Sequence, residues 1–306
     1  MKIALTGGTG FLGRYIIDAL SSQKHDITAW YRPKSTRSLE SVDLCHKHLP
    51  SIQWIGGELG DSAATQNLVA NAEILIHAAL SRTGISFRGS EGNLEEYMQR
   101  NFIGSIKLLE AARAAGVRRV ILISTCAVHE KILSDRPLDE THPVWPASHY
   151  GAGKAALEAM VHSYALGQNW EIAAIRPCGI YGAARPIEES KWYNLIQQVA
   201  KGEPVNVQGG GKEVHASDVA QAIALLCNAP SEAITGAIYN CCDRYISQFE
   251  VATIAKELSG SQATITGTAS QPKNQIDSSR LKALGFQFGG EEKLRETISQ
   301  ILHSRL

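Results

Sequence analysis

Three side chains in the middle of the chain have the types and the spacing that proton transfer at a substrate oxygen requires. Tyr150 and Lys154 stand four residues apart, which places them on one face of a helix, and Thr125 follows a strand upstream. A tyrosine phenol has an ordinary pKa of about 10, so it is a poor base at neutral pH unless a nearby ammonium stabilises the phenolate. The pattern predicts that Tyr150 transfers the proton, that Lys154 lowers its pKa, and that Thr125 donates a hydrogen bond to the substrate oxygen.

The same tyrosine–lysine spacing also describes an ordinary exposed helix pair, so the prediction depends on other motifs. The strongest of these is a glycine loop at the start of the chain. Gly7, Gly10 and Gly13 form the pattern G-x-x-G-x-x-G between an apolar strand and a helix that begins at Phe11. Such glycines permit a tight turn and close backbone approach to a pyrophosphate, and the helix offers free N–H groups. The loop therefore predicts a bound dinucleotide.

The residues after the second strand distinguish between the two nicotinamide dinucleotides. An acidic side chain there binds the ribose 2′-hydroxyl of NAD, whereas an arginine accommodates the 2′-phosphate of NADP. Arg32 and Lys34 follow the strand, Arg37 lies just beyond, and no Asp or Glu occurs between Ile27 and Ser38. Arg32 therefore favours NADP over NAD, and the alternative interpretation is an arginine that is merely solvated.

Short apolar strands alternate with helices through the first half, which is typical of a parallel sheet with helices on both faces. We expect strands over 2–6, 26–30, 52–55, 73–77, 119–123 and 171–175. We expect helices over 11–20, 94–115 and 151–167, with Gly116 and Gly167 ending the second and the third. The predicted fold class is α/β, a Rossmann-type doubly wound parallel sheet.

The pattern changes after Tyr181. A tight loop is expected over Gln208–Lys212, helices over 218–226, 247–258 and 291–302, and a short strand over 237–240. We predict a smaller C-terminal substrate-binding lobe that is interwoven with the first domain. The dinucleotide-binding domain is expected to comprise residues 1–176 plus about 214–240, and the lobe about 177–213 plus 241–306.

Composition excludes several classes of protein. Hydrophobic residues make up 44% and charged residues 20% of the 306 positions, so the chain is not disordered or fibrous. Basic and acidic residues number 30 each, which makes nucleic acid and anionic membranes poor candidates as partners. No apolar run approaches the ~20 residues of a membrane span, and early glycines interrupt any signal peptide, so we expect a cytoplasmic protein.

Cysteine and histidine spacing gives no indication of a metal site. None of the six cysteines forms a C-x-x-C pair, and no H-E-x-x-H cluster is present, so no metal is expected. We interpret the neighbours Cys241 and Cys242 as two buried apolar residues at a strand end, with a vicinal redox pair as the alternative.

Together these motifs resemble the extended short-chain dehydrogenase/reductase family, also called the NAD-dependent epimerase/dehydratase family. The resemblance runs from the glycine loop to Ala283-Leu284-Gly285-Phe286 and includes His77, Asn101 and Arg176-Pro177. It implies an enzyme that transfers a hydride between a nicotinamide and a carbonyl or alcohol carbon of a small or sugar-like substrate. A nucleotide-sugar epimerase or dehydratase is one alternative, and an NADP-sensing regulatory protein without catalysis is another.

The resemblance also implies roles for individual residues. The catalytic set would be Thr125, Tyr150 and Lys154, with Lys154 also binding the nicotinamide ribose. The residues that would contact the cofactor run from the pyrophosphate through the adenosine to the nicotinamide: Gly7, Gly10, Phe11, Leu12, Gly13, Arg32, Glu58, Leu59, Ala78, Ala79, Tyr150, Lys154, Pro177 and Ile180. Asn101 would be a structural or water-relay position, and His77 is interpreted as a core histidine.

Two departures from the family bear on the substrate. Many nucleotide-sugar enzymes of the family grip the substrate diphosphate with an arginine, but the corresponding stretch Gly209–Asp218 contains none. Lys212, Arg185 and Lys191 are the candidates to replace it, and a lysine would do so more weakly because it cannot chelate a phosphate in bidentate fashion. His129 also stands where many members have a tyrosine.

We also expect a homodimer, because the helix over 94–115 and the helix with Tyr150 usually pair with their copies in this family. The residues that would form the apolar stripes are Leu94, Met98, Leu108, Leu109, Ala156, Met160 and Tyr164. The alternative is that these stripes only cover the sheet of their own chain.

Overall fold

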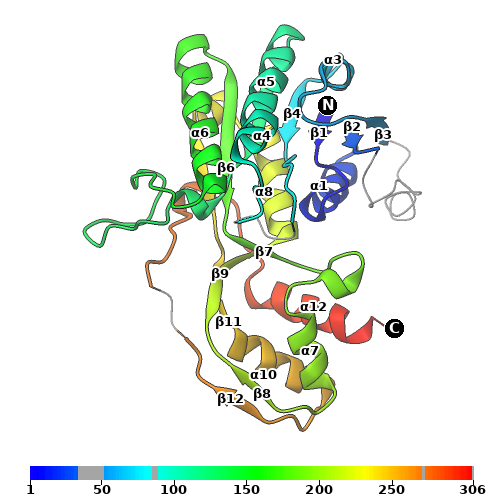
Figure 1. The fold of residues 1–306 in the computed structure, drawn as a ribbon, viewed down its shortest axis with the longest axis vertical. Helices are drawn as coiled ribbons and strands as arrows, with labels where there is room; N and C mark the ends of the chain where they lie inside the picture. The colour runs from blue at the N-terminus through cyan, green and yellow to red at the C-terminus, as the bar shows by residue number, and fades with distance from the viewer. Residues whose placement is uncertain (34–51, 85–88, 271–272, 305–306) are drawn as a thin grey trace. The chain divides into compact units, whose positions relative to one another are not determined.

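The computed structural model describes residues 1–33, 52–84, 89–270 and 273–304 (Figure 1). The chain divides into two compact units, each built from three segments. The first unit comprises Met1–Leu133, Glu140–Arg176 and Ala220–Tyr239. The second comprises Ser134–Asp139, Pro177–Val219 and Asn240–Leu306.

A seven-stranded sheet forms the centre of the first unit, with the strand order β3-β2-β1-β4-β5-β6-β10. The registers of β1 with β2 and β4, of β2 with β3, and of β5 with β4 and β6 are all parallel. The strands are β1 (Lys2–Thr6), β2 (Asp26–Tyr31), β3 (Ile52–Gly56), β4 (Ile74–His77), β5 (Arg119–Ile123), β6 (Glu171–Pro177) and β10 (Ile238–Cys241). The order reverses between β1 and β4, so the predicted Rossmann-type parallel sheet is confirmed.

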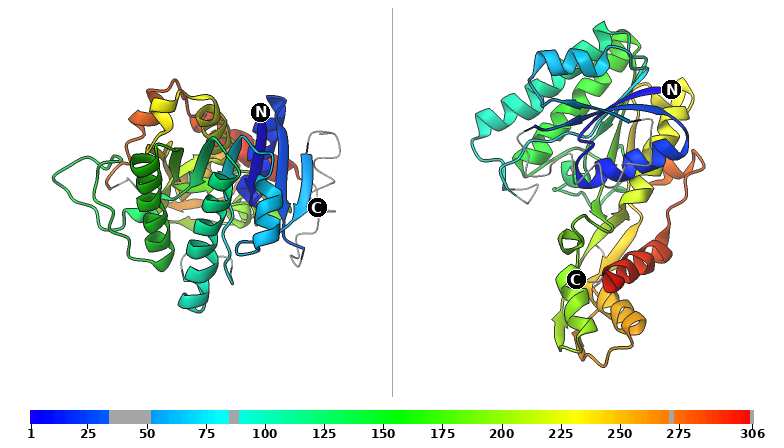
Figure 2. Two further views of the ribbon diagram at one scale, coloured as in Figure 1. Left: turned by 90° about the horizontal axis from the view of Figure 1, so that it is seen from above. Right: turned by 90° about the vertical axis from the view of Figure 1, so that its right-hand side faces the viewer.

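Helices cover both faces of this sheet (Figure 2). Helices α5 (Gly104–Ala114) and α6 (His149–Gln168) lie on one face, and α1 (Phe11–Ser22) and α8 (Ala216–Asn228) lie on the other. Alternate strand residues such as Ala4, Leu75 and Val120 are fully buried beneath α5 and α6. Both faces are covered, which explains why the strands read as continuous apolar runs.

The predicted helix over 94–115 is one helical run with a π-helical turn inside it. Its parts are α4 (Leu94–Met98), the π turn Gln99–Ile103 and α5, and Gly116 follows with a φ of 77°, as expected for a left-handed cap. The expected cap of α6 was wrong. Gly167 lies inside the helix, and Asn169, with a φ of 51°, ends it.

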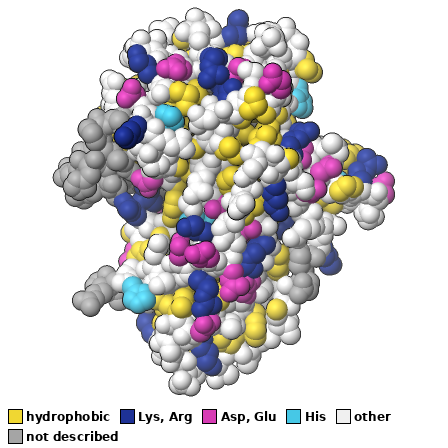
Figure 3. All heavy atoms as spheres, turned by 180° about the vertical axis from the view of Figure 1, so that it is seen from behind, with side chains coloured by type: hydrophobic (Ala, Val, Ile, Leu, Met, Phe, Trp, Pro, Cys, Tyr) yellow, Lys and Arg dark blue, Asp and Glu magenta, His cyan; other side chains and the backbone are white. Residues whose placement is uncertain are grey.

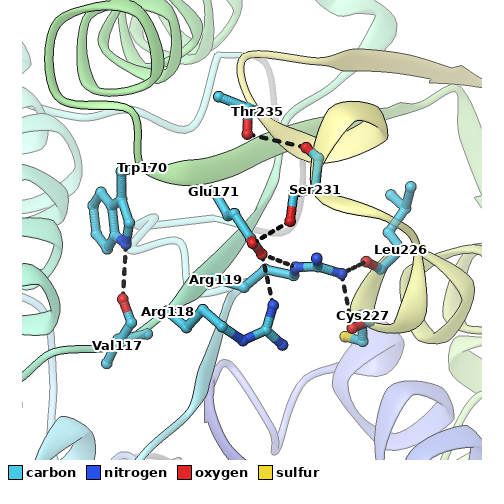
Figure 4. A network of polar contacts seen from close by, with 9 residues as sticks. All are labelled: Val117, Arg118, Arg119, Trp170, Glu171, Leu226, Cys227, Ser231 and Thr235. Atoms are coloured by element: carbon cyan, nitrogen blue, oxygen red, sulfur yellow. Dashed lines mark hydrogen bonds and ion pairs between the residues drawn. The ribbon is translucent and has the colours of Figure 1, made fainter.

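At the amino end of β5, Arg119 is the centre of a polar network that ties three elements together (Figure 4). Its Nε donates to Glu171 at 2.7 Å, and its Nη1 donates to the carbonyls of Leu226 and Cys227 at the end of α8, both at 2.9 Å. The Arg119 side chain is 3% exposed. The network fixes the register of β5, β6 and α8 at the edge where these strands begin.

In its described residues, the second unit contains two small sheets, three helices of eight residues or more and the short helix α11 (Ser279–Lys282). The sheets have the orders β11-β9-β7 and β12-β8. The elements are β7 (Gly179–Tyr181), β8 (Val205–Val207), β9 (Gly210–His215), β11 (Arg244–Ser247), β12 (Ile265–Gly267), α7 (Tyr193–Ala200), α10 (Gln248–Ser259) and α12 (Gly290–His303). Buried apolar residues from the three helices, among them Ile196, Val251 and Ile298, form its core.

The loop expected over Gln208–Lys212 was wrong in its second half, because β9 begins at Gly210. Its glycines make room for a side chain. A Cβ on Gly211 would overlap the carboxylate of the buried Glu213, and a Cβ on Gly179 of the neighbouring β7 would overlap it as well. A glycine run here therefore belongs to a strand for a tertiary reason.

Cys241 and Cys242 are both buried at the end of β10, as expected for two apolar residues at a strand end. Charges of both signs are interspersed on the face shown in Figure 3. Among the described residues, no helix is long and apolar enough to cross a membrane.

Candidate active site

The carboxyl ends of five parallel strands bring the predicted site residues of the first unit to one edge of the sheet. Gly7 follows β1, Arg32 follows β2, Glu58 lies just after β3, Ala78 follows β4, and Thr125 lies two residues after β5. Ligands of open α/β sheets bind outside this edge, where the strand order reverses. The edge is therefore the candidate active site.

The glycine loop is shaped by close backbone contacts. Gly7 has a φ of 76°, and a Cβ there would lie 2.8 Å from the carbonyl carbon of Ala78. A Cβ on Gly13 would overlap the carbonyl oxygen of Gly7. Gly10 is the N-cap of α1 and supplies no side chain, so the first N–H groups of the helix, those of Phe11 and Leu12, have no side-chain cap. This backbone cradle leaves room for a pyrophosphate, and its role in binding one stays a prediction.

The hydroxyl of Thr6 joins the glycine loop to the end of β4. Its Oγ1 accepts from the backbone N–H groups of Ala78 and Ala79, both at 3.1 Å, so its own proton points to Nδ1 of His77 at 2.8 Å. Nε2 of His77 must then carry the ring proton, which it donates to Ser105 at 2.7 Å. Burial, with a smaller effect of nearby Lys154, lowers the pKa of His77 to about 3. His77 is a neutral, satisfied core histidine, as interpreted from the sequence.

Asn101 lies in the π turn and holds the loop that follows β4. Its side chain accepts from the N–H of Ser81 at 2.7 Å and donates to the carbonyls of Ser81 and Tyr97 at 2.9 and 3.0 Å. The extra residue of a π turn re-aims side chains and is common at functional sites. Of the two roles expected for Asn101, these contacts support the structural one.

Tyr150 and Lys154 line one pocket of the first unit, on the face of α6 that approaches the π turn. Lys154 is buried and donates from Nζ to the carbonyl of Ile123, the last residue of β5, at 2.6 Å. Burial lowers the pKa of Lys154 to about 8, and the carboxylate of Glu158 opposes this effect. The pocket is lined by Ala79, Leu80, Tyr97, Met98, Asn101, Phe102, Ser105, Tyr150, Gly153, Lys154 and Leu157.

Two residues beside Tyr150 were not predicted from the sequence. Glu91 accepts a hydrogen bond from the backbone N–H of Tyr150 at 3.3 Å. Tyr97 is buried, and burial together with the charges of Tyr150 and Glu91 raises its pKa to about 12. Tyr97 therefore brings a second, protonated phenol to the pocket. In the sequence, the signal for Tyr97 is its position four residues before Asn101, on the same face of the helical run.

Thr125 is not among the residues that line this pocket, but it is held next to it. Thr125 is the N-cap of the 3₁₀ turn η2 (Cys126–Val128), and its hydroxyl accepts from the N–H of Ala127 at 3.1 Å. The proton of that hydroxyl is thus free to be donated. Gly151 allows α6 to press against this turn, since a Cβ there would lie 2.5 Å from the carbonyl oxygen of Ala127.

A buried charged network lies behind Thr125. Arg176 donates from Nε and Nη2 to the two carboxylate oxygens of Glu158 at 2.8 and 2.7 Å, and both side chains are under 5% exposed. The hydroxyl of Ser124 donates to the same carboxylate at 2.5 Å. Arg176 also donates from Nη1 to Nε2 of His129 at 2.9 Å, and burial followed by the charge of Arg176 lowers the pKa of His129 to about 4.

The remaining cofactor candidates lie in different surroundings. Arg32 and Glu58 are exposed, and Leu59 is half-buried against the core. Lys34 and Arg37 lie outside the described residues. Pro177, which ends β6, and Ile180 of β7 belong to the second unit.

Of the lysines expected to replace a diphosphate clamp, Lys191 is already paired. Its Nζ lies 2.5 Å from both carboxylate oxygens of Glu213, which is buried. Lys212 is half-buried on β9, and Arg185 is exposed. The charge of Lys191 is therefore largely neutralised within the unit.

The fold is that of a Rossmann-type enzyme of the extended short-chain dehydrogenase/reductase class, and Tyr150 and Lys154 line one pocket of it. A family model described as "NAD dependent epimerase/dehydratase family" matches residues 3–242, and the chain belongs to this family. Its members are nicotinamide-dependent enzymes.

Comparison with individual proteins supports the same family. The chain is 28% identical over 302 residues to the low-salt glycan biosynthesis protein Agl12 of Haloferax volcanii, covering 94% of this chain and 93% of that protein. It is 26% identical to the dTDP-D-glucose 4,6-dehydratase of Mus musculus, covering 97% and 87%. A UDP-glucose-4-epimerase from Stenotrophomonas maltophila with bound NAD and formylated UDP-arabinopyranose superimposes with a TM-score of 0.80 at 21% identity, covering 99% and 98%.

Proposed function

We propose that this protein binds NADP(H) and moves a hydride between the nicotinamide and a carbonyl or alcohol carbon of a small or sugar-like substrate. The observation that carries the proposal is the pocket that Tyr150 and Lys154 share with Ala79. Ala78 and Ala79 contact the glycine loop through Gly7 and Thr6. The acid–base pair and the dinucleotide cradle are thus parts of one continuous edge.

The residues at this edge fit a dinucleotide. A side chain on Gly7 or Gly13 would fill the cradle, and the backbone N–H groups of Phe11 and Leu12 are available for the pyrophosphate. Glu58 and Leu59 would border the adenine, and Ala78 and Ala79 the ribose. Pro177 and Ile180 would contact the nicotinamide. When bound, the nicotinamide supplies the group that accepts or gives the hydride.

The chain's own residues would handle the proton. Tyr150 moves it to or from the substrate oxygen, and Lys154 stabilises the phenolate and holds the nicotinamide ribose. Thr125 donates a hydrogen bond to the same oxygen from its free hydroxyl proton. Burial around Lys154 strengthens its effect on Tyr150, because charges interact more strongly away from water.

NADP is proposed over NAD because Arg32 follows β2 directly and is exposed, so its guanidinium can reach a 2′-phosphate. An arginine binds phosphate through paired charge-assisted hydrogen bonds, which an NAD ribose cannot provide.

Epimerisation or dehydration of a nucleotide-linked sugar is the second candidate, and the second unit would bind that substrate. The relatives named above favour it, since they include a dTDP-D-glucose 4,6-dehydratase. The pairing of Lys191 with Glu213 opposes a role for Lys191 in binding a diphosphate. A clamp would then have to come from Lys212 or Arg185.

A substrate panel separates these functions. The protein would be incubated with NADP⁺ or NADPH and with UDP-glucose, UDP-glucuronate, UDP-N-acetylglucosamine, dTDP-glucose and a set of small aldehydes and ketones. A change in nicotinamide absorbance supports simple oxidation or reduction. A new sugar without net absorbance change supports epimerisation or dehydration. Cofactor binding with no turnover of any compound would favour the NADP-sensing regulator and contradict the proposed enzyme.

A further inference from the structure

We propose that Glu158, held in place by Arg176, is a positioning residue that sets Thr125 opposite Tyr150. This inference rests on the proposed function for the roles of Thr125 and Tyr150. Glu158 itself touches neither the pocket nor the proposed cradle. It acts through the segment that carries Thr125.

Helix α6, which carries Tyr150, forms hydrogen bonds with two consecutive residues at the end of β5. Lys154 donates to the carbonyl of Ile123 at 2.6 Å, and one turn later Glu158 accepts from the hydroxyl of Ser124 at 2.5 Å. Ile123 and Ser124 are the two residues directly before Thr125. The position of Thr125 relative to Tyr150 is therefore fixed by side chains of α6 and not only by the sheet.

Arg176 holds the 3₁₀ turn η2 from its other side. Its backbone carbonyl accepts from the thiol of Cys126 at 3.0 Å, and its Nη1 donates to His129, which follows the turn. His129 accepts at Nε2, so its Nδ1 carries the proton and donates to the carbonyl of Pro143 at 3.2 Å. The turn that begins at Thr125 is thus fixed before, within and after its three residues.

The gain in folding stability from this buried ion pair does not explain why it is present. A buried ion pair loses its hydration, and replacing one by packed apolar residues is often neutral or stabilising. The Glu158–Arg176 pair instead supplies directed hydrogen bonds to Ser124 and His129, on both sides of Thr125. A displacement of about 1 Å in a reacting group can slow a reaction about 100-fold, so directed bonds at this place matter for rate.

The chain contains a matched control for this pair. The buried Arg119 of β5 and the half-buried Glu171 of β6 form another ion pair, at the end of β6 opposite to Arg176 (Figure 4). Their network contacts Arg118, Ser231 and the end of α8, and it contacts neither Thr125 nor α6. Glu171→Gln therefore breaks an ion pair of the same sheet at a place from which it cannot affect the positioning of Thr125.

The test compares Glu158→Gln with Glu171→Gln, using the panel compound that the wild type turns over fastest. Both variants should lower the thermal midpoint. Only Glu158→Gln should lower kcat, by about 10- to 100-fold, with KM and the NADP⁺ dissociation constant changed less than about threefold. Equal loss of kcat in the two variants, or full kcat in Glu158→Gln, would overturn the proposal.

A pH profile adds a readout that a purely structural role would not change. The titratable groups around Lys154 are Glu158 on its own helix, His77 at the end of β4 and Tyr150 in the pocket. The carboxylate of Glu158 raises the pKa of Lys154, so its removal should move the alkaline limb of kcat to lower pH. An unmoved limb would argue against the coupling of Glu158 to the site.

Ser124→Ala covers the case in which Glu158→Gln does not fold. It removes one hydrogen bond and leaves the ion pair intact, so kcat should fall about tenfold, and Ser124→Thr should restore part of it.

If no panel compound reacts, the proposed function fails, and the positioning of Thr125 is then tested by hydrogen exchange. Faster exchange at Ala127 in Glu158→Gln than in Glu171→Gln would support it, and equal rates would refute it.

Discussion

Tyr150 is the residue on which the proposed chemistry depends most directly. Tyr150→Phe keeps the ring and its packing but removes the oxygen that moves the proton. General acid–base groups contribute roughly 10²–10⁴-fold in rate, so the hydride step should slow by about that factor while NADP⁺ affinity changes little. Stopped-flow absorbance of the nicotinamide would measure it. Near-full turnover in this variant would show that the phenol is not the proton donor.

Lys154→Met is the companion change to Tyr150→Phe, because Lys154 is assigned both to Tyr150 and to the nicotinamide ribose. It should lower both turnover and cofactor affinity, whereas Tyr150→Phe lowers only turnover. If Lys154→Met kept its affinity for NADP⁺, Lys154 would not bind the nicotinamide ribose, and only its role toward Tyr150 would stand.

Arg32 is the residue on which the proposed preference for NADP depends. Arg32→Ala should weaken NADP⁺ binding at least tenfold, because a charge-assisted hydrogen bond to phosphate is lost, and it should leave NAD⁺ binding unchanged. Titration of both cofactors by intrinsic fluorescence would check this. Equal affinity of the wild type for the two cofactors would refute the preference for NADP.

At the scale of the element, two glycine-to-alanine substitutions, one in the glycine loop and one in helix α6, should have opposite effects on stability. Gly13→Ala places a Cβ against the carbonyl of Gly7, so α1 must shift, and both NADP⁺ affinity and the thermal midpoint should fall. Gly167→Ala lies in open space inside α6 and should stabilise the protein by up to about 1 kcal/mol. Thermal unfolding with and without NADP⁺ measures both. A Gly13→Ala variant with unchanged affinity would mean that the loop does not hold the cofactor.

The start of α12 is a pH-sensitive junction. Asp218 on α8 is buried and accepts from the N–H of Gly289 at 3.0 Å. Burial, followed by the nearby charge of Asp243, raises the pKa of Asp218 to about 6 against an ordinary 3.8. The folded state therefore keeps a proton that the unfolded state has lost between about pH 4 and 6, so stability falls as the pH rises through this range.

Asp218→Asn should remove this dependence, because an amide oxygen still accepts from Gly289 and carries no charge. The variant should be more stable than the wild type at pH 7.5, by about 1–3 kcal/mol, and the difference should disappear near pH 4. Denaturant unfolding at several pH values would measure it, with the exposed Asp135→Asn as a control. A pH-independent difference would contradict the assigned titration.

The sequence predicted the strands of the main sheet to within two residues, because their apolar runs reflect burial on both faces. The ends of elements that depend on distant contacts were harder. Asn169 ends α6 in place of Gly167, and the glycines of β9 make room for Glu213, neither of which a local pattern encodes. The positions of Tyr150 and Lys154 followed from a local spacing, whereas Glu158, His129 and Tyr97 join the site through contacts between distant segments.

At the scale of the whole molecule, the predicted homodimer remains a proposal. Leu108, Leu109 and Tyr164 are buried in their own core, so they do not belong to a dimer surface. Leu94 of the predicted stripe is 41% exposed on α4, and Ile103 of the π turn, which was not part of that stripe, is 37% exposed.

Replacing Leu94 and Ile103 together by Glu should convert a dimer into a monomer, because the charges would have to be buried. Light scattering at micromolar concentration would measure the mass, with Leu258→Glu in α10, also 37% exposed, as a control that keeps the dimer. A monomeric wild type would refute the prediction.

The strand order of the main sheet delays the pairing of β6 with β10 while the chain is being synthesised. The edge strand β10 begins about 60 residues after β6 ends, and most of the chain between them belongs to the other unit. At ~5–20 residues per second, a ribosome needs roughly 3–12 s to make that stretch. Throughout this interval β6, with its apolar run Ile172–Ile175, presents an unpaired edge that can template aggregation. The edge of β6 is thus the place in the main sheet where we expect the nascent chain to aggregate before β10 is made.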